Sequence, residues 1–158
     1  MRSPIPECRV GPIFKSMGDI ETSKAPRPVG PYPHAKRIGD WLYLSGVGPR
    51  LPGSNEVPGN KKNESGRLVD YDFTAQCHSV MQNVRSILEE AGARLEDLVD
   101  VTVFLTDMKS DFETFNRIYA EYFRSHRPCR TTVEVNALPT EIAIELKCIA
   151  HLGEELQT

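Results

Sequence analysis

Two neighbouring stretches near the C-terminus decide the fold of this chain: Pro128-Cys-Arg-Thr-Thr-Val-Glu-Val-Asn-Ala-Leu-Pro139 and Ile142-Ala-Ile-Glu-Leu-Lys-Cys-Ile-Ala-His151. Each is rich in apolar and β-branched residues, which indicates a strand. In the second stretch every other residue from Ile142 to Ala150 is apolar, while Glu145 and Lys147 fall on the opposite face. Such alternation predicts a strand with one face packed against helices and the other facing away from them.

Two charged residues interrupt these strands, Arg130 at the start of the first and Glu145 in the middle of the second. A charge inside an apolar strand is costly to bury unless it has a partner or a function. An arginine fork matches a carboxylate with two hydrogen bonds, and a nearby glutamate can hold and polarise a water molecule. Alternation in the first strand predicts Val133 and Val135 toward the helices, with Arg130 and Thr132 on the face of Glu145. We therefore expect a small-molecule carboxylate site with hydrolytic capability.

Two amphipathic helices are predicted in the middle of the chain. The first carries an apolar stripe from Phe73 to Ala91 at spacings of three and four. Asp70 or Asp72 can cap its start, and Gly92 is well placed to end it. The second is predicted to open with a capping box, Ser110-Asp-Phe-Glu113, and carries an aromatic stripe that indicates core packing.

The remaining elements are predicted strands and a loop. Leu98 to Thr106 reads as a buried strand, with Val99 on its buried face. Residues 32–38 and 41–47 read as a hairpin around a Gly-Asp turn, and 51–66 as a polar loop. Together these elements predict an α+β fold, one mixed sheet covered on one side by two helices. The other sheet face is either solvated or closed by another subunit, and we expect oligomerisation.

Length and composition indicate one globular domain. The chain has 158 residues, of which 39% are hydrophobic and 26% charged, and ten of its 12 prolines lie in the first 58 positions. We divide it into an N-terminal extension at 1–24 that is disordered or leans on a neighbour, a domain at 25–153, and a C-terminal tail at 154–158.

Several function classes are disfavoured by the sequence. A net charge of −3 argues against electrostatic binding of nucleic acid. No apolar run approaches the roughly 18–20 residues of a membrane span, and no signal-peptide pattern is evident. The four cysteines are scattered, and no histidine pair has metal-ligand spacing. We expect a cytoplasmic protein with no metal and with neither membrane nor nucleic acid as partner.

Four groups of residues occur in an order and spacing typical of one family: Gly30-Pro31-Tyr32, Leu44-Ser45-Gly46, Asp111-Phe112 with Asn116, and the block from Arg130 to Glu145 with Leu138-Pro139. The chain resembles the Rid family of reactive-intermediate deaminases, also called YjgF-type, over about residues 26–152. The resemblance implies a homotrimer of chorismate-mutase-like domains with active sites between subunits. It also implies that enamines and imines are hydrolysed to ketones and ammonia with no metal or organic cofactor.

The resemblance implies roles for individual residues. Arg130 would clamp the substrate carboxylate, and Glu145 would position the attacking water as the second catalytic residue. Tyr32 would line the cleft, and Gly46 would lend backbone groups close to the substrate. Asn116 would serve as a cleft or helix-packing residue.

The stretch Tyr32-Pro-His-Ala-Lys-Arg37, followed by Gly39-Asp40, is similar to the 2-aminomuconate deaminases of this family. That similarity implies hydrolysis of 2-aminomuconate to 2-oxohex-3-enedioate (4-oxalocrotonate) and ammonia in aromatic or tryptophan catabolism. The second carboxylate of this substrate needs a further cation. The candidates are His34, Lys36, Arg37 and Arg50.

Other functions stay open at the level of sequence. One is a broad-range deaminase of 2-aminoacrylate-type enamines and imines, although Thr132 stands where such enzymes often carry cysteine. Another is a non-catalytic regulatory trimer that binds 2-oxo acids in the same cleft. A ribonuclease role, attached to relatives of this family, is disfavoured by the acidic balance and by the absence of an evident basic and aromatic surface.

Overall fold

The computed structural model describes residues 17–153, so the predicted tail at 154–158 and residues 1–16 of the predicted extension lie outside it. Its elements in chain order are β1 (Met17–Ile20), β2 (Ala35–Ile38), β3 (Trp41–Leu44), β4 (Asn60–Lys62), β5 (Leu68–Tyr71), α1 (Phe73–Glu90), the short 3-10 helix η1 (Leu95–Asp97), β6 (Leu98–Leu105), α2 (Met108–Phe123), β7 (Cys129–Glu134) and β8 (Ile144–His151).

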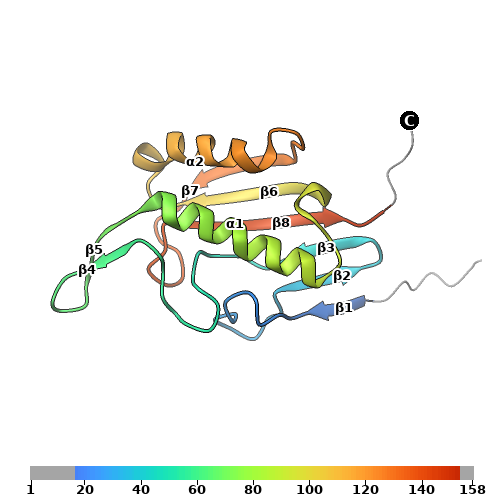
Figure 1. Ribbon diagram of the computed structural model, residues 1–158, viewed down its shortest axis with the longest axis horizontal. Coiled ribbons are helices and arrows are strands. Elements are labelled where there is room, and N and C mark those ends of the chain that lie inside the picture. Colours follow the sequence, from blue (N-terminus) through green and yellow to red (C-terminus); the bar gives the residue numbers. More distant parts are fainter. Residues whose placement is uncertain (1–16, 154–158) are drawn as a thin grey trace, which may run out of the picture.

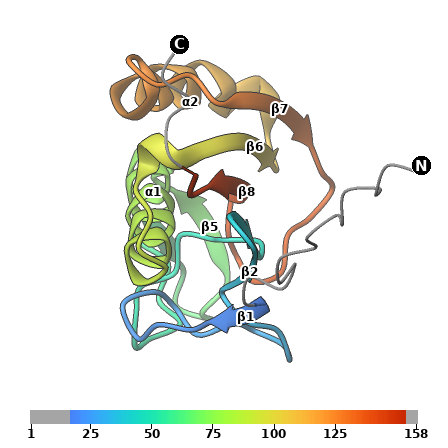
Figure 2. The same cartoon turned by 90° about the vertical axis from the view of Figure 1, so that its right-hand side faces the viewer.

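Six of the strands form one mixed sheet in the order β1-β2-β3-β8-β6-β7 (Figure 1). β6 and β7 pair in parallel because α2 connects them as a crossover, and the other neighbours are antiparallel. Figure 2 shows α1 and α2 on one side of the curved sheet, while its other side stays open. The predicted α+β fold, with two helices on one face of a mixed sheet, is confirmed.

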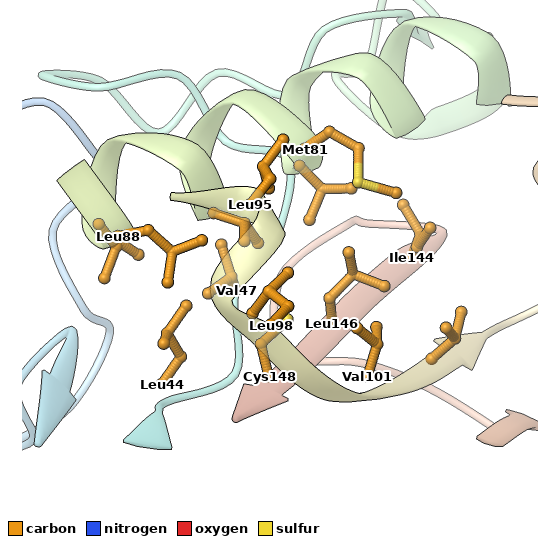
Figure 3. Packing of buried hydrophobic residues seen from close by; sticks show 14 of the residues in the cluster. Leu44, Val47, Met81, Leu88, Leu95, Leu98, Val101, Ile144, Leu146 and Cys148 are labelled. Carbon is orange, nitrogen blue, oxygen red and sulfur yellow. The ribbon is translucent and has the colours of Figure 1, made fainter. Parts of the chain in front are cut away.

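The hydrophobic core lies between this sheet and α1. Met81 and Leu88 project from α1 toward Val47, Leu98 and Leu146 (Figure 3), and all five side chains are buried. Burial of each leucine-sized side chain contributes about 1.5–3 kcal/mol relative to exposure. The alternation predicted for the last strand is therefore confirmed, because its apolar residues face this core.

The ends of α1 follow the sequence signals. The carboxylate of Asp72 accepts a hydrogen bond from the Ala75 N–H at 3.1 Å, and Gly92 ends the helix with a φ of +77°. The start predicted for the second helix is wrong. α2 begins at Met108 because Asp107 is its cap, accepting hydrogen bonds from both the backbone N–H and the hydroxyl of Ser110 at 2.9 and 2.8 Å.

Three smaller predictions also need correction. Residues 17–20 of the predicted extension form β1, an edge strand paired with β2. The predicted polar loop at 51–66 contains β4, which pairs with β5 in a separate two-stranded sheet. Val99 is 40% exposed because the pairing register shifts between Leu98 and Asp100, which removes it from the buried face. Within residues 17–153, no helix is both long enough and apolar enough to cross a bilayer.

Candidate active site

Glu145 lies on the open face of the sheet, at the second position of β8. Its cross-strand neighbour on β6 is Phe104. On the other side, two backbone hydrogen bonds of 2.8 and 2.9 Å join Val47 to Leu146 and hold the segment after β3 against β8. This segment brings Gly46 directly against the Glu145 carboxylate, with no room for a side chain between them. The predicted proximity of Gly46 to the catalytic centre thus has a steric basis.

The Glu145 carboxyl is suited to exchange protons. It is half-buried, and within residues 17–153 it has no hydrogen-bond or ion-pair partner. Burial raises its pKa above the ordinary value for glutamate, because a desolvated carboxylate is disfavoured relative to the neutral acid. A carboxyl group whose pKa lies closer to neutrality both accepts and returns protons efficiently, as general acid–base catalysis requires.

A cavity of about 130 Å³ opens beside Glu145. This volume is close to that of engineered cavities that hold a benzene-sized molecule. Tyr32, Gly46 and Arg50, three of the residues predicted from sequence, contribute to its lining. Thr140 also lines the cavity, with a φ of +68° that is unusual for a residue other than glycine.

Among the residues that the structure describes, Arg50 is the cationic residue that lines this cavity. Its guanidinium donates hydrogen bonds to Asn55 Oδ1 at 3.0 Å and to the carbonyl of Arg27 at 2.8 Å, which fix its position. The other candidate cations are engaged elsewhere. Lys36 pairs with Asp19 at 3.2 Å, and Arg37 donates to the carbonyl of Gly39. Of the four cations considered for a second carboxylate, Arg50 is the one that lines the cavity beside Glu145.

His34 is placed as a structural residue. It is buried, its Nδ1 accepts a hydrogen bond from the Thr22 N–H at 3.3 Å, and its Nε2 lies 3.0 Å from the carbonyl of Pro26. Because Nδ1 accepts, Nε2 carries the proton and donates it to Pro26. Neither ring nitrogen is left for a substrate, so the binding role predicted for His34 has no geometric basis here.

Arg130 does not share a face with Glu145, which corrects the orientation predicted from alternation. The parallel register pairs Arg130 with Val101 and Thr132 with Val103, and both valines face the helices. Arg130 and Thr132 therefore point to the helix side, and Val133 is on the open side. The prediction failed because β7 is an edge strand, where the apolar residue of each pair is not necessarily the inward one.

Aromatic rings of α2 support the Arg130 side chain. The guanidinium carbon lies 4.8 Å from the ring centre of Tyr119, 5.4 Å from that of Phe115 and 6.0 Å from that of Phe112. Arginine stacks well on aromatic faces because its charge is spread over a plane. Within the described residues it has no carboxylate partner, so its outer edge is free to bind an anion. Asn116 lies on the same side of α2, four residues after Phe112.

Two side chains that sequence reasoning missed hold the cavity in shape. Asn83 and Gln76 are buried on α1, and each hydrogen-bonds to a loop that lines the cavity. The available signal was the occurrence of two amides on an otherwise apolar helix face. Within residues 17–153, no group of three His, Cys, Asp or Glu side chains is arranged to hold a metal ion.

Comparison with known proteins gives consistent matches across the chain. A family model described as Endoribonuclease L-PSP matches residues 22–152. A RutC family protein of Pyrococcus abyssi is 41% identical over 132 residues, which cover 84% of this chain and 94% of the relative. Reactive Intermediate Deaminase A, chloroplastic, of Arabidopsis thaliana is 37% identical over 84% of this chain and 65% of the plant protein.

The fold also matches solved structures. The crystal structure of Escherichia coli TdcF with bound serine superposes with a TM-score of 0.72 at 32% sequence identity, covering 85% of this chain and 98% of that one. The matched region includes Tyr32, Glu145 and every other residue placed in the candidate site.

Proposed function

Because this chain belongs to the Rid family of reactive-intermediate deaminases, we propose that it hydrolyses carboxylate-bearing enamines and imines to 2-oxo acids and ammonia. The observation that carries the proposal is the Glu145 carboxyl, which is half-buried, lacks a partner within residues 17–153 and faces a small cavity. Burial of an unpaired carboxyl lowers the stability of the folded protein. Groups kept in such an environment cluster at functional sites.

The proposed reaction needs only water and proton transfer. An enamine tautomerises to its imine, and a water molecule held by Glu145 adds its oxygen to the imine carbon while the carboxylate accepts the proton. Glu145 then returns that proton to the nitrogen, which gives a carbinolamine. In the second step the carboxylate takes the proton of the new hydroxyl group and passes it to the amino nitrogen, so the carbon–nitrogen bond breaks, ammonia leaves and the carbonyl forms. General acid–base help of this kind contributes about 10²–10⁴ in rate, which suits imines because they already hydrolyse readily in water.

The opposite orientations of Arg130 and Glu145 favour a site built by two copies of the chain. Within one protomer the sheet itself separates the two side chains. The open sheet face also carries exposed apolar side chains, among them Trp41 and Tyr43 of β3. A surface of this kind favours association. We propose a homotrimer in which Arg130 of one copy binds the substrate carboxylate beside Glu145 of another.

Two substrate classes fit the cavity. Arg50 lines the same cavity as Glu145, and a second cation in the cavity lining favours a dicarboxylate such as 2-aminomuconate. The alternative is a broad range of small imines of the 2-aminoacrylate type. It is favoured by the modest cavity volume and by the small amino acid named as bound in the TdcF structure.

The test compares both substrates in one assay. 2-Aminomuconate is generated in situ from its semialdehyde, and simple imines are supplied by an amino-acid oxidase. Ammonia release is followed with and without the protein. Faster release on either substrate is expected for the wild type, and the preferred substrate decides between the two classes. Glu145→Gln should abolish the acceleration while it leaves carboxylate binding intact. Binding without any acceleration by the wild type would instead establish a 2-oxo acid sensor.

A further inference from the structure

α1 carries a row of polar side chains on the side that faces the candidate site. Gln76, Ser79 and Asn83 are spaced by three and four residues, so they lie on one side of the helix. Gln76 and Asn83 are fully buried, with exposures of 0% and 2%. Buried amides are retained where they are hydrogen-bonded, and all three side chains in this row bond to loops rather than to their own helix.

Asn83 and Ser79 hold the loop that carries Arg50. The side-chain amide of Asn83 donates to the carbonyl oxygens of Gly48 at 2.9 Å and of Arg50 at 2.8 Å. The hydroxyl of Ser79 donates to the carbonyl oxygen of Pro49 at 2.6 Å. Three successive carbonyl groups are thus fixed by one helix. The backbone from which the Arg50 side chain extends is thus held in one place beside the cavity that Arg50 lines.

Gln76 holds a second segment that lines the cavity, the loop before β8. Its side-chain oxygen accepts from the Ala143 N–H at 2.8 Å, and its side-chain amide donates to Asn60 Oδ1 at 2.8 Å. Asn60 in turn donates to the carbonyl of Glu141 at 2.8 Å. These bonds lie just after Thr140, whose left-handed backbone needs support from its surroundings. The same helix therefore holds two of the segments that line the cavity.

We propose that Asn83 is a positioning residue that places Arg50 to meet the distal carboxylate of a dicarboxylic substrate. The inference rests on the dicarboxylate form of the proposed function. Asn83 does not touch the cavity itself. It acts by fixing the backbone from which the Arg50 side chain extends, and a shift of this backbone moves the guanidinium relative to Glu145.

The experiment measures binding of two unreactive probes by calorimetry. trans,trans-Muconate and sorbate share a six-carbon diene and one carboxylate, and only muconate has a second carboxylate at the far end. Asn83→Ala and Asn83→Asp remove the two donated hydrogen bonds. Both should weaken muconate binding roughly 10- to 100-fold, the range expected when a charged hydrogen bond from Arg50 to the distal carboxylate is lost, and leave sorbate binding unchanged. Ser86→Ala is the matched control, because Ser86 is buried on α1 but bonds only to Gln82.

The outcomes separate this inference from the proposed reaction, because binding does not require turnover. Equal weakening of both probes, unchanged muconate binding, or no muconate binding by the wild type would each overturn it. Should both Asn83 variants fail to fold, Ser79→Ala removes a single bond to the same loop. It is expected to weaken muconate selectively by a smaller factor, and an unchanged affinity in that variant would also overturn the proposal. If the protein shows no deamination activity, the binding test still decides whether Asn83 positions Arg50.

Discussion

Gly46 lies so close to Glu145 that a β-carbon at position 46 would stand 2.5 Å from Oε1 and 2.9 Å from the carboxyl carbon. No side chain other than hydrogen fits in that space while the carboxyl keeps its place. The reason for glycine here is the close approach of the two groups. The absence of a side chain at Gly46 therefore leaves the space that the Glu145 carboxyl occupies.

Gly46→Ala should inactivate the protein without unfolding it. The new methyl group pushes the Glu145 carboxyl away from the cavity, and a displacement near 1 Å can cost about 10²-fold in rate. The measurement is kcat/KM for ammonia release, together with the melting temperature. Gly18→Ala is the control, because a β-carbon at Gly18 meets no atom within 4 Å. Wild-type kinetics in Gly46→Ala would show that Glu145 has no defined position in catalysis.

Stability should depend on pH through Glu145. Its folded-state pKa is raised by burial, so between the ordinary carboxyl pKa and the raised value the folded state binds more protons than the unfolded state. The free energy of unfolding then falls as pH rises through this window. Glu145→Gln does not have to bury an ionised carboxylate. Its free energy of unfolding relative to the wild type should therefore increase from about pH 4 and level off above the raised pKa of Glu145.

Urea unfolding between pH 4 and pH 8 tests this dependence. Glu113→Gln is the comparison, since Glu113 is an exposed glutamate on α2. It should show no such trend. A Glu145→Gln variant that loses stability relative to the wild type as pH rises would reverse the sign and contradict the burial argument.

Arg130→Lys should weaken substrate binding even though the charge is kept. Lysine loses both the planar fork for a carboxylate and the stacking on Tyr119 and Phe115. A charged hydrogen bond contributes about 1.5–3 kcal/mol, so KM should rise on the order of 10- to 100-fold. Arg85→Lys provides the control, because Arg85 also lies over a ring, that of Tyr122 at 5.9 Å. A similar KM change in both variants would point to general loss of packing.

Complementation between two inactive variants tests the shared site. Arg130→Ala and Glu145→Gln are each expected to be inactive. When the two are unfolded and refolded together at equal amounts, about a quarter of the sites in random closed rings combine an intact arginine with an intact glutamate from a neighbour. Activity should recover to about that fraction. Mixed oligomers without recovered activity would mean that both residues act within one chain.

Most of the fold could be predicted from the sequence because its signals are periodic. The two helices, the last strand and the hairpin around Gly39 follow from spacing and turn chemistry, and the structure places them close to the expected ranges. β4 was missed because its Asn-Lys-Lys sequence carries no hydrophobic pattern. The start of α2 was missed by three residues because two possible caps, Asp107 and Ser110, stand three residues apart.

The site was only partly predictable. The chemistry of Glu145, Tyr32, Gly46 and Arg50 was read from residue types and family motifs, and these four residues meet in one cavity. The orientation of Arg130 could not be predicted from the sequence, because alternation shows which residues share a face but not which face is inward. Which face of β7 is inward depends on the pairing with its partner strand, and the parallel register with β6 determines it.

The sequence by itself determined the α+β architecture and the residue types available for imine hydrolysis, since hydrophobic periodicity and turn residues act locally along the chain. The tertiary structure alone decided three matters: which cation reaches the cavity, which face Arg130 occupies, and how α1 holds two of the segments that line the cavity. Each depends on contacts between residues far apart in the sequence. Such contacts are set by strand register and loop path, which no local pattern encodes.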